Sequence, residues 1–212
     1  MFIIFGIVHY EIFFITAVLL NLMPGPDTLF ILSRSISQGR ITGIYSVLGT
    51  SAGCLVHTVF ASLGLSIILS QSALAFSIVK LAGALYLGYL GITTLLAKSN
   101  TLVLQSGKTA SHKSTFWQGL LVDVLNPKVA LFFLSFLPQF IEPQNQYGAL
   151  PFILLGLTFI LTGTIWLLIL VYFSASITTL LRQSSAAAKL MDKVCGSIYL
   201  LLGIKLLAAE RE

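Results

Sequence analysis

The stretch NLMPGPDTLF, residues 21–30, interrupts the first long apolar run of the chain. Pro24, Gly25 and Pro26 are helix breakers, and Asp27 places a carboxylate directly after them. A proline inside a helix removes a backbone donor and clashes with the preceding turn, which frees backbone polar groups. In lipid, such groups are tolerated only where protein buries them or where they line a water-filled cavity. The stretch therefore predicts a membrane helix that is broken for a functional reason.

The composition of the whole chain supports a membrane setting. Of the 212 residues, 57% are hydrophobic and 9% are charged, whereas about a quarter of a soluble domain is charged. We therefore expect lipid to surround most of the chain. The net charge of +5 comes from short loops and not from one patch, so we expect no nucleic-acid partner. Cys54 and Cys195 fall in apolar runs and form no CxxC pair, which argues against a disulfide or redox motif.

Six apolar segments are long enough to cross a bilayer, which takes about 20 residues. Only helices satisfy every backbone group within such a segment. We therefore predict an all-α polytopic membrane protein with six transmembrane helices. The N-terminal segment lacks a basic n-region and a small-residue cleavage site, so we expect a retained first span and not a signal peptide. The segments lie at about residues 9–32, 44–70, 74–97, 116–141, 149–181 and 188–208.

Basic residues in the loops predict the orientation of the chain. Eight of them follow the first, third and fifth segments, against three on the opposite side. The positive-inside rule then makes the polar loop 98–115 cytoplasmic and both termini extracytoplasmic. The eight are Arg34, Arg40, Lys98, Lys108, Lys113, Arg182, Lys189 and Lys193, and the three are Lys80, Lys205 and Arg211.

The two halves of the chain share short patterns in the same order. We therefore predict two three-helix repeats, residues 1–97 and 116–212, joined by the loop 98–115. Because each unit has an odd number of spans, the repeats must have inverted topology, an architecture that transporters use for alternating access. The patterns are Lys80-x-x-Gly83-x-x-Tyr86 with Lys193-x-x-Gly196-x-x-Tyr199, Leu48-Gly49 with Leu155-Gly156, and Pro24 with Pro127.

The breaks in the first and fourth helices are predicted to lie at matching depths. Pro24 lies ten residues before Arg34, and Asn126 lies ten residues after Phe116. Ten helical residues span about 15 Å, half the thickness of the hydrocarbon layer. Both breaks are therefore expected near the bilayer midplane, where paired discontinuous helices form the site of many transporters.

Charged and amide side chains accompany both breaks. Asp27 follows the first, and Asp123, Asn126 and Lys128 surround the second. Helix N-termini favour anions, so these groups suit a zwitterionic amino acid. Asp27 either caps its own half-helix or contacts the substrate, and one side chain can do both. Since a charge at the membrane centre costs at least about 2.5–3.5 kcal/mol, we also hypothesise that Asp27 and Lys128 pair across the two breaks.

These motifs resemble those of the LysE/RhtB amino-acid exporters, and within them the branch that exports homoserine, threonine and leucine. The resemblance runs from the first span to the last. It implies an oligomeric exporter of small amino acids in the inner or plasma membrane, driven by the proton motive force. The family's functional residues map onto Pro24, Gly25, Pro26, Asn126, Pro127 and Lys128. The motifs are MPGPDTLF (23–30) with Gly39-Arg40, KLAGALYLGYLG (80–91), and NPK (126–128) through FLPQF (136–140).

Other functions remain as alternatives. His57 in the second span is either a proton relay, because histidine titrates near physiological pH, or a packed and hydrogen-bonded side chain. Asp27, His57 and Asp123 could just suffice for a metal-ion exporter of related architecture. The sequence shows no nucleophile–base pair, so we expect neither an enzyme nor a cofactor. A purely structural membrane protein would not explain two matched breaks.

Overall fold

The computed structural model describes residues 5–65, 73–96, 110–174 and 185–208. In these residues the regular elements are helical, with one isolated β-bridge between Ile7 and Ile141. The elements are α1 (Tyr10–Leu22), α2 (Pro26–Gln38), α3 (Arg40–Phe60) with the π-turn η1 (Ala61–Leu65), α5 (Ala73–Leu96), α6 (His112–Val124), α7 (Pro127–Leu131), the π-turn η2 (Phe132–Phe136), the 3₁₀ turn η3 (Leu137–Phe140), α8 (Leu150–Tyr172) and α10 (Ser185–Ala208).

Both predicted breaks are present. The axes of α1 and α2 bend by 50° across residues 23–25, and those of α6 and of residues 127–140 bend by 47°. Pro26 and Pro127 are the first residues of α2 and α7. Proline is favoured at this position because its φ is already helical and the missing N–H would have no partner there. Each break is therefore the end of one helix followed by a proline-led start of the next.

The described residues contain two unbroken candidate membrane spans, α3 with most of η1 (Arg40–Gly64) and α8. The bent pairs raise the number to as many as four. The expected third and sixth segments form α5 and α10, each of 24 residues. The all-helical prediction is thus confirmed, whereas the count of six spans stays a prediction. Parts of several predictions lie outside the described residues: 66–70, the loop residues 98–109, 175–181, and the side chains of Lys80, Cys195 and Tyr199.

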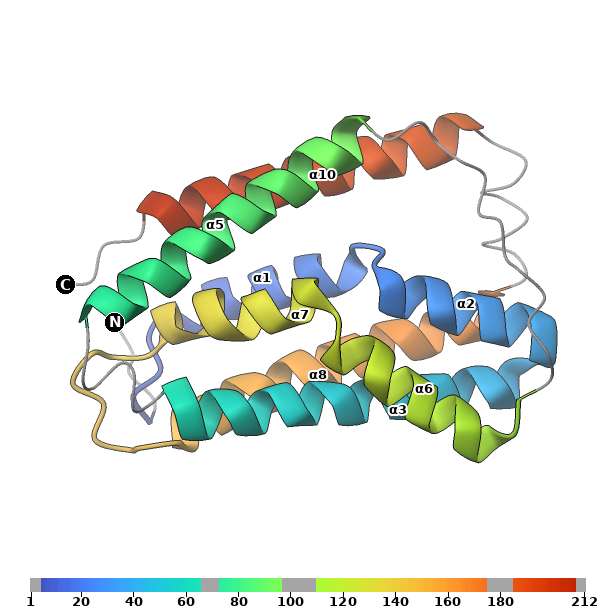
Figure 1. The fold of residues 1–212 in the computed structure, drawn as a ribbon, viewed down its shortest axis with the longest axis horizontal. Coiled ribbons are helices and arrows are strands. Elements are labelled where there is room, and N and C mark those ends of the chain that lie inside the picture. The colour runs from blue at the N-terminus through green and yellow to red at the C-terminus, as the bar shows by residue number, and fades with distance from the viewer. Residues whose placement is uncertain (1–4, 66–72, 97–109, 175–184, 209–212) are drawn as a thin grey trace.

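The helices form two groups (Figure 1). One group contains α1, α2, α3, α6, α7 and α8, in which α3 packs on α6, α8 and α2, and α1 packs on α8. The second group is the pair of α5 and α10, which lies along one side and meets the first group mainly where α5 contacts η2. The site described below lies entirely in the first group.

Glycines allow α3 and α6 to approach closely. A methyl group on Gly119 would lie 2.7 Å from the carbonyl oxygen of Ser46, and one on Gly49 would overlap the carbonyl of Phe116. A methyl group on Gly53 would lie 2.7 Å from the Cβ of Asp123. Small residues at such crossings are typical of membrane helix packing. This approach presses Asp123 against α3.

A cluster of phenylalanines packs around the turns η2 and η3 that follow the second break. Phe132 stacks on Phe159 of α8 with ring centroids 4.4 Å apart, and Phe13 of α1 meets Phe140 at 5.3 Å. These side chains are buried. Burying a large apolar side chain stabilises a fold by about 1.5–3 kcal/mol. The cluster therefore fixes α7, η2 and η3 against α1 and α8, and holds the second break in place.

Candidate functional site

Lys128 connects the two breaks. It is the second residue of α7 and is 5% exposed. Its Nζ donates hydrogen bonds to the carbonyl of Met23 at 3.0 Å and, more weakly, to that of Leu20 at 3.5 Å. Both carbonyls lie at the C-terminal end of α1, and Pro24, four residues after Leu20, has no N–H to donate to the Leu20 carbonyl. The Leu20 carbonyl instead accepts the backbone N–H of Met23 at 3.3 Å, in addition to the Lys128 ammonium. A cation near the start of its own helix opposes the helix dipole, but here the ammonium lies at the C-terminus of α1, where the dipole favours it.

Asp27 faces Lys128 from the first helix pair. It is the second residue of α2 and is buried, and its Oδ1 lies 3.8 Å from Lys128 Nζ. The predicted pairing across the two breaks is therefore present as an ion pair without a short hydrogen bond. Within the described residues Oδ1 has no hydrogen-bond partner. The carboxylate lies in the first turn of α2, at the positive end of that helix's dipole.

Gly25 makes room for this ion pair. A methyl group in its place would lie 2.6 Å from Asp27 Oδ1 and 3.1 Å from Lys128 Nζ. Its φ of −136° is one that any residue adopts, so the restriction comes from space and not from the backbone. The Pro24-Gly25-Pro26 sequence thus ends one helix, admits two charged groups and starts the next helix.

Asn126 caps the second half-helix. Its Oδ1 accepts a hydrogen bond from the backbone N–H of Lys128 at 3.1 Å, as expected of an asparagine N-cap. Asn126 is 1% exposed, and its Nδ2 lacks a partner in the described residues. Its backbone N–H donates to the carbonyl of Asp123 at 2.9 Å. The amide of Asn126 thus retains donor capacity inside the fold.

His57 contacts the second break from α3. Its Nε2 donates to the carbonyl oxygen of Asp123 at 3.2 Å, because a carbonyl can only accept. The ring stacks on Phe133 with centroids 5.9 Å apart. This is the packed and hydrogen-bonded arrangement that the sequence left open beside a relay. The relay role stays a prediction.

A cavity of about 340 Å³, including the space at its mouth, lies between the two breaks and the helices α3 and α8. Of the predicted site residues, Asp27, Asp123 and Lys128 line the cavity. Val129, Phe159, Ile160 and Leu167 form an apolar wall. The remaining lining residues are Asn21, Thr50, Ser51, Cys54, Gly163 and Thr164. The cavity therefore has a charged side and an apolar side.

Several polar lining residues were not predicted from the sequence. Asn21 donates through Nδ2 to the carbonyl of Phe159 at 3.2 Å and to Thr162 Oγ1 at 3.0 Å. The hydroxyls of Ser51 and Thr164 join α3 to α8 at 2.8 Å. Their polarity inside apolar runs was the available signal. It was weak, because hydroxyl side chains in helices commonly bond their own preceding turn.

No three His, Cys, Asp or Glu side chains gather at metal-binding distance in the part of the chain that the structure describes. Asp27, His57 and Asp123, which the sequence offered as candidate metal ligands, therefore form no such group. His57 contacts Asp123 only through its backbone carbonyl.

Comparison with known proteins identifies relatives along nearly the whole chain. The model of the family described as LysE type translocator matches residues 18–210. The chain is 32% identical over 198 residues to "Uncharacterized membrane protein YrhP" of Bacillus subtilis, covering 89% of this chain and 93% of that protein. It is 29% identical over 210 residues to "Uncharacterized membrane protein PA4757" of Pseudomonas aeruginosa, covering 96% and 97% of the two chains. No solved structure matches.

Proposed function

The chain belongs to the LysE type translocator family of membrane proteins, and we propose that it exports small amino acids or their derivatives across the cytoplasmic membrane. The observation that carries this proposal is the cavity between the two helix breaks, with Asp27, Asp123 and Lys128 in its wall. Buried charges are costly in a membrane protein and mark substrate or ion pathways.

The charged groups suit a zwitterion. The substrate carboxylate would bind beside Lys128 and the N-terminus of α2, since both favour an anion. The substrate ammonium group would bind beside the protein carboxylates that line the cavity. The substrate side chain would lie against the apolar wall of Phe159, Ile160 and Leu167. A substrate without charges at its α-carbon would leave these buried groups unmatched, at a cost of several kcal/mol.

Alternating access around this site is supported by the matching of the two halves. The helices α1 and α6 have 13 residues each, α5 and α10 have 24 each, and α2 with 13 residues corresponds to residues 127–140. Both second half-helices begin with proline. We therefore propose six transmembrane helices in two inverted three-helix repeats with breaks near the midplane. One repeat would rock against the other around the cavity.

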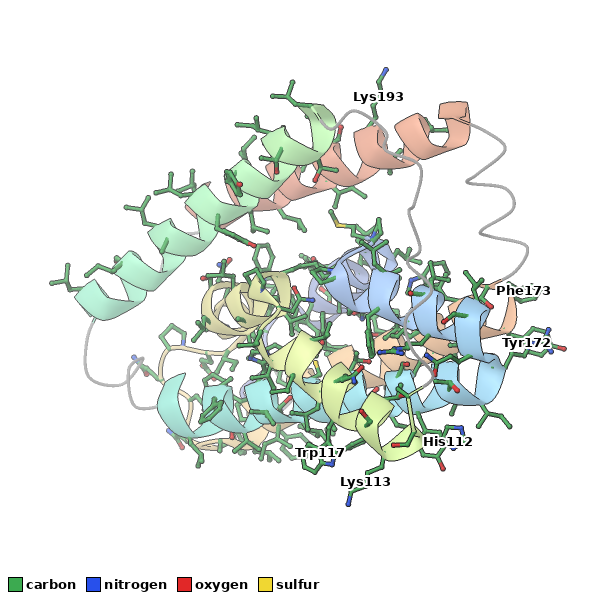
Figure 2. All side chains as sticks on the ribbon, turned by 45° about the vertical axis from the view of Figure 1, so that its right-hand side comes forward. His112, Lys113, Trp117, Tyr172, Phe173 and Lys193 are labelled. Carbon is green, nitrogen blue, oxygen red and sulfur yellow. The ribbon has the colours of Figure 1, made fainter. Side chains whose placement is uncertain are left out.

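The proposed orientation places the N-termini of α3 and α6 in the cytoplasm. Arg40 lies over the ring of Tyr172 at 4.5 Å, and Tyr45 stacks on His112 at 4.6 Å, so basic and aromatic side chains gather at this end. Figure 2 shows His112, Lys113, Trp117, Tyr172 and Phe173 on the outside of this region. Basic and aromatic anchors are typical of a cytoplasmic interface. Both termini are then extracytoplasmic. We further propose that the proton motive force drives export and that the protein forms a homo-oligomer.

Export from cells loaded with dipeptides tests this function. Peptidases release single amino acids inside, and the medium is assayed for all of them. We expect selective release that needs the wild-type chain and falls in Asn126→Ala, because the cap and the buried amide are lost. Gln146→Ala, an exposed loop amide outside the cavity, is the matched control and should behave as wild type. Equal release from empty-vector cells, with the protein present in the membrane, would refute amino-acid export.

A further inference from the structure

Asp123 has the only carboxylate of the cavity without a cation beside it in the described part of the chain. The other carboxylate, on Asp27, has Lys128 Nζ at 3.8 Å, and no ion pair of Asp123 occurs among the described residues. Asp123 is 4% exposed, and its Oδ2 is buried without a hydrogen-bond partner. The site thus contains a buried acidic oxygen with nothing in the described chain to satisfy it.

The position of Asp123 is fixed from two sides. Its carbonyl oxygen accepts the backbone N–H of Asn126 at 2.9 Å and Nε2–H of His57 at 3.2 Å. Its Cβ and Oδ2 lie against Gly53, where a methyl group would be 2.7 and 3.0 Å from them. Lys128 is also held, by the carbonyls at the end of α1. A partner for the Asp123 carboxylate must therefore enter through the cavity.

The titratable and charged groups facing Asp123 are Asp27 from α2, Lys128 from α7, and Cys54 and His57 from α3. His57 uses its Nε2–H on the backbone carbonyl, and a thiol is a weak donor. Two carboxylates with one ammonium leave an excess of one negative charge. An uncompensated buried charge costs several kcal/mol. A single added positive charge, from a proton or from a substrate ammonium group, would neutralise this excess.

We propose that Asp123 binds the substrate ammonium group and the coupling proton in turn, so that each excludes the other. This inference rests on the exporter function proposed above. An ammonium group needs the ionised carboxylate as its acceptor, whereas the protonated carboxyl has lost the charge that makes this bond strong. The proton is taken from water on the extracytoplasmic side and returns to cytoplasmic water when the amino acid binds. One proton enters for each amino acid exported, and Asp27 and His57 take no part in this exchange.

Proton release on binding tests the inference. Each common amino acid is added in turn to the purified full-length protein in weakly buffered detergent containing a pH dye. Under acidic conditions we expect the wild type to release about one proton per amino acid bound. Its affinity for the amino acid should then fall about tenfold for each unit by which the pH is lowered, as proton linkage requires. His57→Gln should keep this release, and Asp27→Asn should keep the stoichiometry at lower affinity. Loss of the release in His57→Gln, or binding by the wild type without release, would overturn the inference.

Infrared spectroscopy identifies the group that holds the proton, and it can be applied to Asp123→Asn even if this variant no longer binds amino acids. Infrared spectra of the empty wild type at acidic pH should show the C=O stretch of a protonated carboxyl group that disappears on adding amino acid. The band should be absent from Asp123→Asn, shifted in Asp123→Glu and retained in Asp27→Asn. A band that persists in Asp123→Asn would assign the proton to another group. Failure of every amino acid to bind the wild type would instead refute the exporter function, so the two failures are distinguishable.

Discussion

The ion pair between Lys128 and Asp27 joins the two broken helices, so Lys128→Met should destabilise the fold strongly. At 3.8 Å, two unit charges attract by about 4 kcal/mol for an effective dielectric constant of about 20. The variant also removes the charged donor to the Met23 carbonyl at 3.0 Å, a kind of bond worth about 1.5–3 kcal/mol. Partial relief of desolvation offsets these terms, and removing one partner of a buried pair typically costs about 3–5 kcal/mol. We expect a loss in that range.

Thermal unfolding in mild detergent measures this loss. For a chain of this length each kcal/mol lowers the midpoint by about 2–4 °C, so Lys128→Met should unfold roughly 6–20 °C earlier than the wild type. Lys113→Met is the matched control. Lys113 is exposed on α6, and its side chain extends outward in Figure 2. The same chemical change there should stay within about 0.5 kcal/mol.

A double-mutant cycle isolates the pair itself. Asp27→Asn removes the carboxylate charge, and the combined variant removes both partners. If the pair acts as described, the double variant is less destabilised than the sum of the single variants, by a coupling energy of a few kcal/mol. Single effects that add to within about 0.5 kcal/mol would show that the two charges do not stabilise each other. The electrostatic reasoning would then be wrong, whatever the single losses.

Three further substitutions probe the surroundings of the site. Gly25→Ala should cost about 1–3 kcal/mol by wedging between the paired charges, whereas Gly88→Ala, where a methyl group would meet nothing within 4 Å, serves as its control in the same unfolding assay. Asn126→Ala should cost about 1 kcal/mol through loss of the N-cap, and Asn126→Ser, which keeps an acceptor without adding a charge, should restore most of it. Gly119→Leu should separate α3 from α6 and lower the unfolding midpoint more than Gly64→Leu, an exposed position where a methyl group would meet nothing within 4 Å. A Gly119 variant as stable as the wild type would contradict the close crossing.

The breaks could be predicted because their causes are local. Proline acts on its own turn and the turn before it, so Pro24, Pro26 and Pro127 locate the interruptions without knowledge of the fold. The contact between Asp27 and Lys128 was also predictable, because a lone buried charge in lipid is costly and the two opposite charges follow equivalent breaks. Local chemistry and charge balance were sufficient for this part of the site.

The lining from α3 and α8 could not be predicted in the same way. In lipid, outward-facing and inward-facing residues are both apolar, so the hydrophobic pattern does not show which side of a helix faces the cavity. The hydroxyls of Ser51 and Thr164 bond to each other between two helices, whereas Thr58 bonds the carbonyl of Cys54 in its own helix. The residue types alone do not distinguish these two cases. Asn21 lies beside the helix breakers Pro24 and Gly25, which by themselves account for the interruption of this stretch. The partner of a polar side chain in a membrane helix is decided by tertiary packing.

The positions of Asp27 and Lys128 also bear on how the two halves relate. Each is the second residue of a half-helix that begins with proline, so the two residues are structurally equivalent if the halves are the inverted repeats proposed above. Equivalent residues of two-fold related repeats can meet at the axis, and these two lie 3.8 Å apart. Two identical halves would bring like charges together there, which disfavours ionisation of both. A site of this geometry therefore requires the halves to differ at this residue, one carrying an acid and the other a base.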